Sequence, residues 1–207
     1  MNIEAGSEVI DMSLASTGLF GVHHTARPTW KLADTVRFYR EVMGLRLVHA
    51  ITARGWGPAD HPDFLHFFFD SGNGSTIAFF YYIGTSCPAH MQPSDDYLGR
   101  SPHTAWRVNS VEQLRAWRTR LEQHGVKVSP DTQHELITSI YFYDPNGYML
   151  EITLQTRPLE KSDEQDATLT LQAAIQLEAE SLSGCQGLRS IDDVWRLKGQ
   201  LIEASLQ

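Results

Sequence analysis

The sequence lacks the features that mark several large classes of protein. Its two cysteines, Cys87 and Cys185, do not have metal-binding spacing, which favours free thiols in a reducing cytoplasm. Lysine and arginine total 17 against 25 aspartates and glutamates, a net charge of −8, so no basic stripe for nucleic acid is visible. Apolar stretches such as the one around Phe64–Phe69 are far too short to span a bilayer. Residues 1–20 contain no lysine or arginine, so they lack the charged start of a signal peptide.

The remaining composition is that of an ordinary globular chain. Of the 207 residues, 42% are hydrophobic and 20% are charged, which is enough apolar material for a core without disulfides. This length predicts one domain or two small ones. Nine histidines are a high count for the length and are the first indication of chemistry.

Two segments of the chain resemble each other, with a period of about 75 residues. Each begins with a His-Thr-Ala triplet, continues into a helical pattern that ends at a glycine, and later contains an Asn-Gly hairpin turn. Both copies are predicted to form a strand, a helix and then three strands. The triplets start at His24 and His103, the helices end at Gly44 and Gly125, and the turns are at 73–74 and 146–147.

This repeat predicts an α+β fold of two tandem βαβββ modules. The expected boundaries are an N-terminal extension at 1–18, a first module at 19–84 and a second module at 99–156. Residues 157–207 are predicted to form an acidic linker, including 160–166, and a helical C-terminal extension. That extension carries no catalytic constellation, and we expect it to pack on the sheet or against a partner subunit.

Strand parity places potential metal ligands at equivalent positions of the two modules. Alternate residues of a strand share a face, so His24, Ala78, His103 and Glu151 are all predicted to point inward. A lone histidine or glutamate at a strand is usually a core or surface residue, and His23, of opposite parity, illustrates this. The joint placement of three ligand types at matching positions predicts a site of two histidines and one carboxylate.

Two further groups of residues suggest chemistry around such a site. Tyr141 could hydrogen-bond a phenolic oxygen, although a core tyrosine is equally compatible with its spacing. His66, inside an apolar strand, suits proton transfer near neutral pH, and a core histidine bonded to backbone is the alternative. An apolar wall of substrate contacts is predicted from aromatic residues: Phe68, Phe80, Tyr143 and Trp56, with Tyr82 as a possible addition.

These residues resemble the vicinal oxygen chelate superfamily, which is built from paired βαβββ modules. The resemblance implies that the two modules pair into one curved mixed sheet enclosing a cleft. Within the superfamily, the stretch from His134 to Glu151 is similar to the signature of extradiol ring-cleavage dioxygenases. That signature asks for a histidine, an aliphatic–tyrosine pair, an acidic or amide residue before proline, a glycine and a closing glutamate. The corresponding residues are His134, Ile140-Tyr141, Asp144-Pro145, Gly147 and Glu151. The larger family members have four modules, whereas this chain has a single pair.

The resemblance implies an Fe(II)-dependent dioxygenase that opens a catechol ring with O2 during breakdown of aromatic compounds. It implies His24, His103 and Glu151 as iron ligands, with Mn(II) or another divalent metal as a variant. It implies His66 as the acid–base residue, Tyr141 facing the substrate and His134 in the second sphere. We also expect a cytoplasmic homo-oligomer, a dimer or larger, that binds neither nucleic acid nor membrane.

Two other kinds of protein share this fold. One is a metal-dependent isomerase of the glyoxalase or epimerase type, or a thiol transferase. Such enzymes often use a second carboxylate in the first module, and Ala78 argues against the four-ligand version only. The other is a metal-free protein that binds drugs, and the presence of all three ligand types argues against it.

Overall fold

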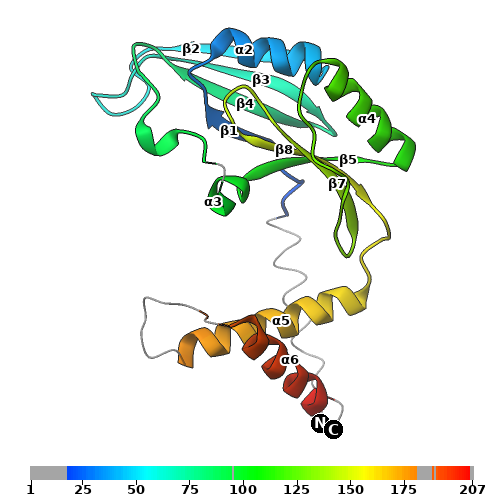
Figure 1. The fold of residues 1–207 in the computed structure, drawn as a ribbon. Helices are drawn as coiled ribbons and strands as arrows, with labels where there is room; N and C mark the ends of the chain where they lie inside the picture. The colour runs from blue at the N-terminus through cyan, green and yellow to red at the C-terminus, as the bar shows by residue number, and fades with distance from the viewer. Residues whose placement is uncertain (1–17, 95, 181–187, 189, 206–207) are drawn as a thin grey trace. The chain divides into compact units, whose positions relative to one another are not determined.

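The structure is a computed structural model that describes residues 18–94, 96–180, 188 and 190–205 (Figure 1). Nearly all of the predicted N-terminal extension, and Cys185, lie outside the described residues. The chain divides into two compact units. The first comprises Met1–Thr132 and Ser139–Leu154, and the second comprises Gln133–Thr138 and Gln155–Gln207.

The elements confirm the predicted mixed α+β fold with two βαβββ repeats. The first repeat runs through β1 (His24–Pro28), α2 (Leu32–Arg37), the π-helix η1 (Phe38–Val42), β2 (Leu47–Ala53), β3 (Phe64–Gly72) and β4 (Ser75–Tyr82). The 3-10 helix η2 (Ala89–Met91) and α3 (Tyr97–Arg100) follow it. The second repeat runs through β5 (His103–Val108), α4 (Val111–Gln123), β6 (Thr132–Gln133), β7 (Ile137–Tyr143) and β8 (Met149–Gln155).

The strands form two four-stranded sheets with the same topology. Their orders are β1-β4-β3-β2 in sheet A and β5-β8-β7-β6 in sheet B, and β1 and β5 run parallel to β4 and β8. We predicted one curved sheet from the paired modules. The described strands instead form two sheets, and no backbone hydrogen bonds pair the edge strands β1 and β5 with each other. Side chains connect these edges, and Arg27 donates a hydrogen bond to the Thr104 hydroxyl.

Local sequence explains where the helices and hairpins begin and end. The Ser110 hydroxyl accepts a hydrogen bond from the Gln113 backbone N–H and caps α4, a contact worth about 1 kcal/mol. Gly125, at a φ of 74°, follows the end of this helix as predicted. Asn73 and Gly74 have φ angles of 51° and 77°, the left-handed pair that a two-residue hairpin between β3 and β4 requires.

One apolar core joins both repeats within the first unit. It contains Tyr39 and Phe79 from the first repeat and Leu121 and Ile152 from the second, all fully buried. The Tyr39 hydroxyl donates a hydrogen bond to the buried Asp144 at 3.2 Å. Burial raises the pKa of Asp144, and hydrogen bonds to its carboxylate partly oppose that shift. This core fixes one face of each sheet and leaves the opposite faces for chemistry.

The second unit contains the helices α5 (Lys161–Glu180) and α6 (Ile191–Ser205). The prediction of a linker through residue 166 was wrong, since α5 already begins at Lys161. Asp163 accepts the Glu160 backbone N–H and pairs with Arg157 at 2.6 Å, so these acidic residues start the helix. Among the described helices, none is both long and apolar enough to cross a membrane.

Candidate metal centre and aromatic face

Two of the three predicted ligands meet on sheet B. Glu151 on β8 is the register partner of Ala105, so it lies on the same face as His103 on β5. His103 Nε2 is 2.9 Å from Glu151 Oε2, and the Glu151 side chain is only 3% exposed. The parity prediction that these two positions face the same way is therefore met, although parity alone does not establish a metal site.

Hydrogen-bond roles at this pair show that its two facing atoms can share either a proton or a metal ion. The Nδ1 atom of His103 lies 2.9 Å from the carbonyl oxygen of Ser101, which can only accept a hydrogen bond. Nδ1 therefore carries a proton, and in a neutral ring Nε2 then has a lone pair. A lone pair at 2.9 Å from a carboxylate oxygen is unfavourable unless a proton or a metal ion lies between them. The donor set thus fits a divalent metal.

The other oxygen of Glu151 is held by a serine that sequence analysis did not single out as a partner. Ser139 on β7 donates a hydrogen bond of 2.5 Å to Glu151 Oε1, and it is also 2.9 Å from the Thr153 hydroxyl. Ser139 is fully buried. Its place on the same face as Tyr141 could be read from the sequence, but its contact with Glu151 depends on the pairing of β7 with β8.

His24 lies on the corresponding face of sheet A. Its Nδ1 atom is 2.9 Å from Nδ1 of His23, and its ring centroid is 5.8 Å from that of Phe68. Within the part of the chain that the structure describes, no three His, Cys, Asp or Glu side chains are grouped so that they could hold a metal ion. The pair on sheet B and His24 therefore do not form a three-ligand group within one chain.

His66 on β3 is oriented by a backbone carbonyl. It is 7% exposed, and its Nδ1 lies 3.1 Å from the carbonyl oxygen of Phe79, which fixes the proton on Nδ1 and leaves Nε2 as an acceptor. Burial lowers the pKa of His66, with smaller lowering by His24 and His49, and the Phe79 contact opposes the shift. A neutral ring with a free Nε2 is the form that a general base needs.

The predicted tyrosines lie on the same face of β7 as Ser139. The Tyr141 ring meets the His103 ring edge-on, with centroids 6.1 Å apart. Burial raises the pKa of Tyr141, and the charge of Glu151 raises it further, so its hydroxyl stays a hydrogen-bond donor at neutral pH. Tyr143 is more exposed, at 38%. Their proposed contacts with substrate stay predictions.

Aromatic side chains surround His66 on sheet A. The register pairs His66 with Phe80 and Phe68 with Ala78, so these side chains share the face of His24. The rings of His66 and Phe80 stack with centroids 3.7 Å apart at 5°, and Tyr82 lies parallel to Phe80 at 5.7 Å. We call His24, His66, Phe68, Phe80 and Tyr82 the aromatic face.

Trp56 borders the aromatic face through Phe64, which contacts Phe80, and one residue that was not predicted also contacts this face. Trp56 follows β2, is 61% exposed and touches Phe64 with centroids 6.4 Å apart. His134 is an exposed residue after β6 in the second unit, where its backbone N–H donates to the carbonyl oxygen of Ile137. Its role in the second sphere stays a prediction. His49 on β2 contacts Phe68 with centroids 5.6 Å apart, a contact that required the pairing of β2 with β3.

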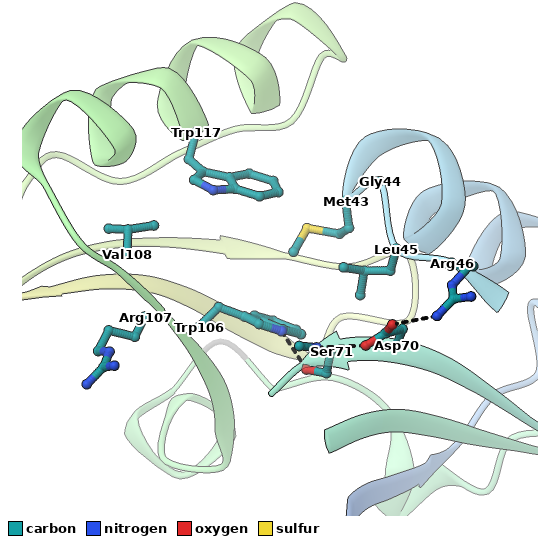
Figure 2. A pocket seen from close by; sticks show the side chains of 11 residues that line it. Met43, Gly44, Leu45, Arg46, Asp70, Ser71, Trp106, Arg107, Val108 and Trp117 are labelled. Atoms are coloured by element: carbon teal, nitrogen blue, oxygen red, sulfur yellow. Dashed lines mark hydrogen bonds and ion pairs between the residues drawn. The ribbon is translucent and has the colours of Figure 1, made fainter. Parts of the chain in front are cut away.

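A separate pocket of about 390 Å³ lies where the two repeats meet (Figure 2). Trp117, Met43 and Leu45 line it, and the Trp106 indole donates a hydrogen bond to Ser71 beside it. None of the predicted ligands or substrate contacts lines this pocket. We therefore assign the chemistry to the residues around the His103–Glu151 pair and not to the pocket.

The fold and the repeat are those of a protein built from two paired βαβββ modules. The model of the Glyoxalase/Bleomycin resistance protein/Dioxygenase superfamily matches residues 21–152. The chain belongs to this superfamily. The resemblance inferred from the sequence is thereby confirmed, together with its two-repeat architecture.

Two curated relatives and one solved structure are similar to parts of the chain. MhqA of Bacillus subtilis, named as a candidate ring-cleaving dioxygenase, is 26% identical over 135 residues, 64% of this chain and 40% of MhqA. The metallothiol transferase FosB of Shouchella clausii is 34% identical over 85 residues, 38% of this chain and 58% of FosB. This chain thus spans less than two thirds of either relative.

The solved structure is a glyoxylase/bleomycin resistance protein/dioxygenase domain from Frankia sp. EAN1pec. It is 20% identical and has a TM-score of 0.51, and the match covers 69% of this chain and 96% of that one. At this identity the likeness establishes the fold and nothing finer about the reaction.

Proposed function

We propose that this protein is an Fe(II)-dependent extradiol dioxygenase that cleaves a catechol ring with O2. The observation that carries the proposal is the His103–Glu151 pair, whose Nε2 and Oε2 atoms face each other at 2.9 Å and could bind one metal ion together. The dioxygenase-type spacing from His134 to Glu151 and the similarity to MhqA support this activity over others in the superfamily. Mn(II) is the alternative metal within the same proposal.

In this proposal, His103 and Glu151 supply two ligands and His24 supplies the third. Since one chain does not bring His24 to the other two, we propose that it comes from a second copy of the chain. A two-fold dimer would exchange this contribution in both directions and form two equal sites. In this proposal the predicted homo-oligomer is required for metal binding, because each chain completes the site of the other.

The residues of the chain have distinct tasks in the proposed reaction. Bound iron would supply the redox chemistry that adds oxygen to the ring beside the two hydroxyls. His66 would accept a hydroxyl proton at Nε2, because its Nδ1 is occupied by the Phe79 carbonyl. Tyr141 would donate a hydrogen bond to a substrate oxygen, and Ser139 would hold Glu151 in position.

The direct test combines metal analysis with product detection. Protein is purified without oxygen, its iron, manganese, zinc and nickel are measured, and a panel of catechols is followed for the yellow ring-cleavage product. Iron or manganese together with product supports the proposal. Zinc or nickel with isomerisation or thiol transfer would contradict it in favour of the glyoxalase or transferase class. Ligand binding without metal would contradict it in favour of a binding protein.

The second candidate is a metal-dependent thiol transferase, which the 34% identity to FosB over 85 residues favours. Thiol transfer to an electrophilic substrate needs no oxygen. An anaerobic assay with a low-molecular-weight thiol therefore separates the two functions in one preparation.

A further inference from the structure

The aromatic face of sheet A is almost free of charge. The strands β1 to β4 contain a single lysine or arginine, Arg27. Arg27 pairs in register with the buried Phe79, so it lies on the opposite face of the sheet from His24 and Phe80. Its guanidinium lies 5.0 Å from the centre of the Tyr148 ring, in the second repeat.

Two ion pairs beside the strands neutralise their own charges. Asp70, the acidic side chain of β3, pairs with Arg46 at 3.1 Å, and Arg54 after β2 pairs with Asp63 at 2.8 Å. An anionic group placed against the aromatic face would lose hydration and find no lysine or arginine on this face of the four strands. A flat uncharged ring would instead contact several aromatic side chains. Each such ring pair contributes more binding free energy than the buried area alone predicts.

We infer that the group attached to the substrate's reacting ring is an uncharged aromatic system that packs on Phe68, Phe80 and Tyr82. The inference rests on the proposed function, because it takes the reacting ring to be a catechol, and it narrows the substrate class. It excludes catechols whose side chain ends in a carboxylate or a phosphate. The nearness of His24 to Phe68, 5.8 Å between ring centres, ties the face to the proposed ligands.

A pair of probes that cannot chelate metal separates this inference from the proposed function. Metal-free protein is titrated with 2-naphthol and with 4-hydroxyphenylacetate in a calorimeter. We expect 2-naphthol to bind at least about tenfold more tightly, because it offers aromatic surface without charge. Equal or tighter binding of 4-hydroxyphenylacetate overturns the inference. If Arg107→Ala then abolishes binding of that probe, Arg107 on sheet B is the cation that binds its carboxylate.

Variants locate the binding on the sheet. Phe80→Leu and Tyr82→Leu each keep an apolar side chain but remove a ring, and each should weaken 2-naphthol binding about threefold to tenfold. Trp117→Leu removes a ring on the core side of α4 and should leave binding unchanged. All three variants are compared by melting temperature, and unchanged affinity in both ring variants overturns the inference.

Turnover then tests the proposed function separately. Iron-loaded protein is given two catechols, 2,3-dihydroxynaphthalene and 3,4-dihydroxyphenylacetate. Like the two probes, the first has an uncharged second ring and the second has a carboxylate side chain. Ring cleavage that favours the naphthalene supports both ideas. Tight naphthol binding with no cleavage of either catechol supports the aromatic ligand and overturns the dioxygenase. Preferred cleavage of the carboxylated catechol overturns the aromatic ligand and supports the dioxygenase.

Discussion

Ser139 donates a hydrogen bond of 2.5 Å to Oε1 of Glu151, which leaves Oε2 facing His103. Ser139 therefore selects which carboxylate oxygen is available to a metal ion. Hydrogen bonds of this kind orient the ligands of metal sites, and their loss weakens metal binding. The serine contributes no ligand atom in this proposal and acts through Glu151.

Ser139→Ala is expected to lower the affinity for iron about 10-fold to 100-fold. The measurement is competition with a chelator, on protein prepared without oxygen. Ser110→Ala is the matched control, because it removes the cap of α4 and should cost about 1 kcal/mol of stability without changing iron affinity. Unchanged iron affinity in Ser139→Ala would remove the serine from the site.

Replacing any one of His24, His103 and Glu151 by alanine should abolish most iron binding. Each supplies one of three ligand atoms, and loss of Glu151 also leaves excess positive charge. The iron content of purified protein measures the effect. His124→Ala, at the exposed end of α4, is the control and should retain its iron. Full iron in His24→Ala would show that the proposed site is wrong.

A mixture of His24→Ala and Glu151→Ala proteins should recover iron if the ligands come from two chains. After subunit exchange, half of the dimers are mixed and each mixed dimer has one intact site, so about a quarter of the wild-type iron is expected. Iron content after unfolding and refolding the two variants together measures this. No recovery would place all three ligands in one chain.

His66→Gln should retain iron and substrate affinity but lower kcat by about 10²-fold to 10⁴-fold, the range for loss of a general base. Glutamine keeps a donor for the Phe79 carbonyl, so the melting temperature should change little. His124→Gln, at the exposed end of α4, is the control and should turn over normally. A His66→Gln protein that melts several degrees lower but turns over normally would make His66 a structural residue.

Asp144→Ala should destabilise the protein by about 2–4 kcal/mol, because it leaves buried donors without an acceptor. Those donors include the backbone N–H groups of Asn146 and Tyr148 and the Tyr39 hydroxyl. Urea denaturation measures the loss, and exposed Asp34→Ala should change stability by less than about 1 kcal/mol. A loss equal to that control would contradict the buried network.

The same residue predicts a pH dependence with a definite sign. Burial raises the pKa of Asp144, so the folded state holds its proton more tightly than the unfolded state. The stability of the wild type relative to Asp144→Asn should therefore increase as the pH falls through the folded pKa, and it should decrease as the pH rises. Urea titrations of both proteins from neutral pH downward measure this difference.

Much of the fold could be predicted because the pattern is local and occurs twice. Asn73-Gly74 and the Ser110 cap act within a few residues, and both formed as expected. Strand parity likewise placed His103 and Glu151 on one face, since alternation is a property of each strand alone.

Other features depend on contacts that a sequence does not encode locally. The partnership of Ser139 with Glu151 follows from the pairing of two strands, and the separation of His24 from the other ligands follows from how the sheets are arranged. The early start of α5 was missed because an acidic run resembles a linker. It becomes a helix start only through the contacts of Asp163 with Arg157 and Glu160.

The contacts between the repeats have a consequence for the ancestry of such a chain. Aligned on their histidine triplets and Asn-Gly turns, Arg27 corresponds to Trp106 and Ser71 to Asp144. Trp106 donates to the small neutral Ser71, whereas the buried Asp144 takes a hydrogen bond from Tyr39. A chain with two copies of the second repeat would bury two such aspartates without the Tyr39 hydroxyl that Asp144 contacts. A chain with two copies of the first repeat would have no aspartate at this position. Although the two halves share a topology, they meet through different and complementary hydrogen bonds.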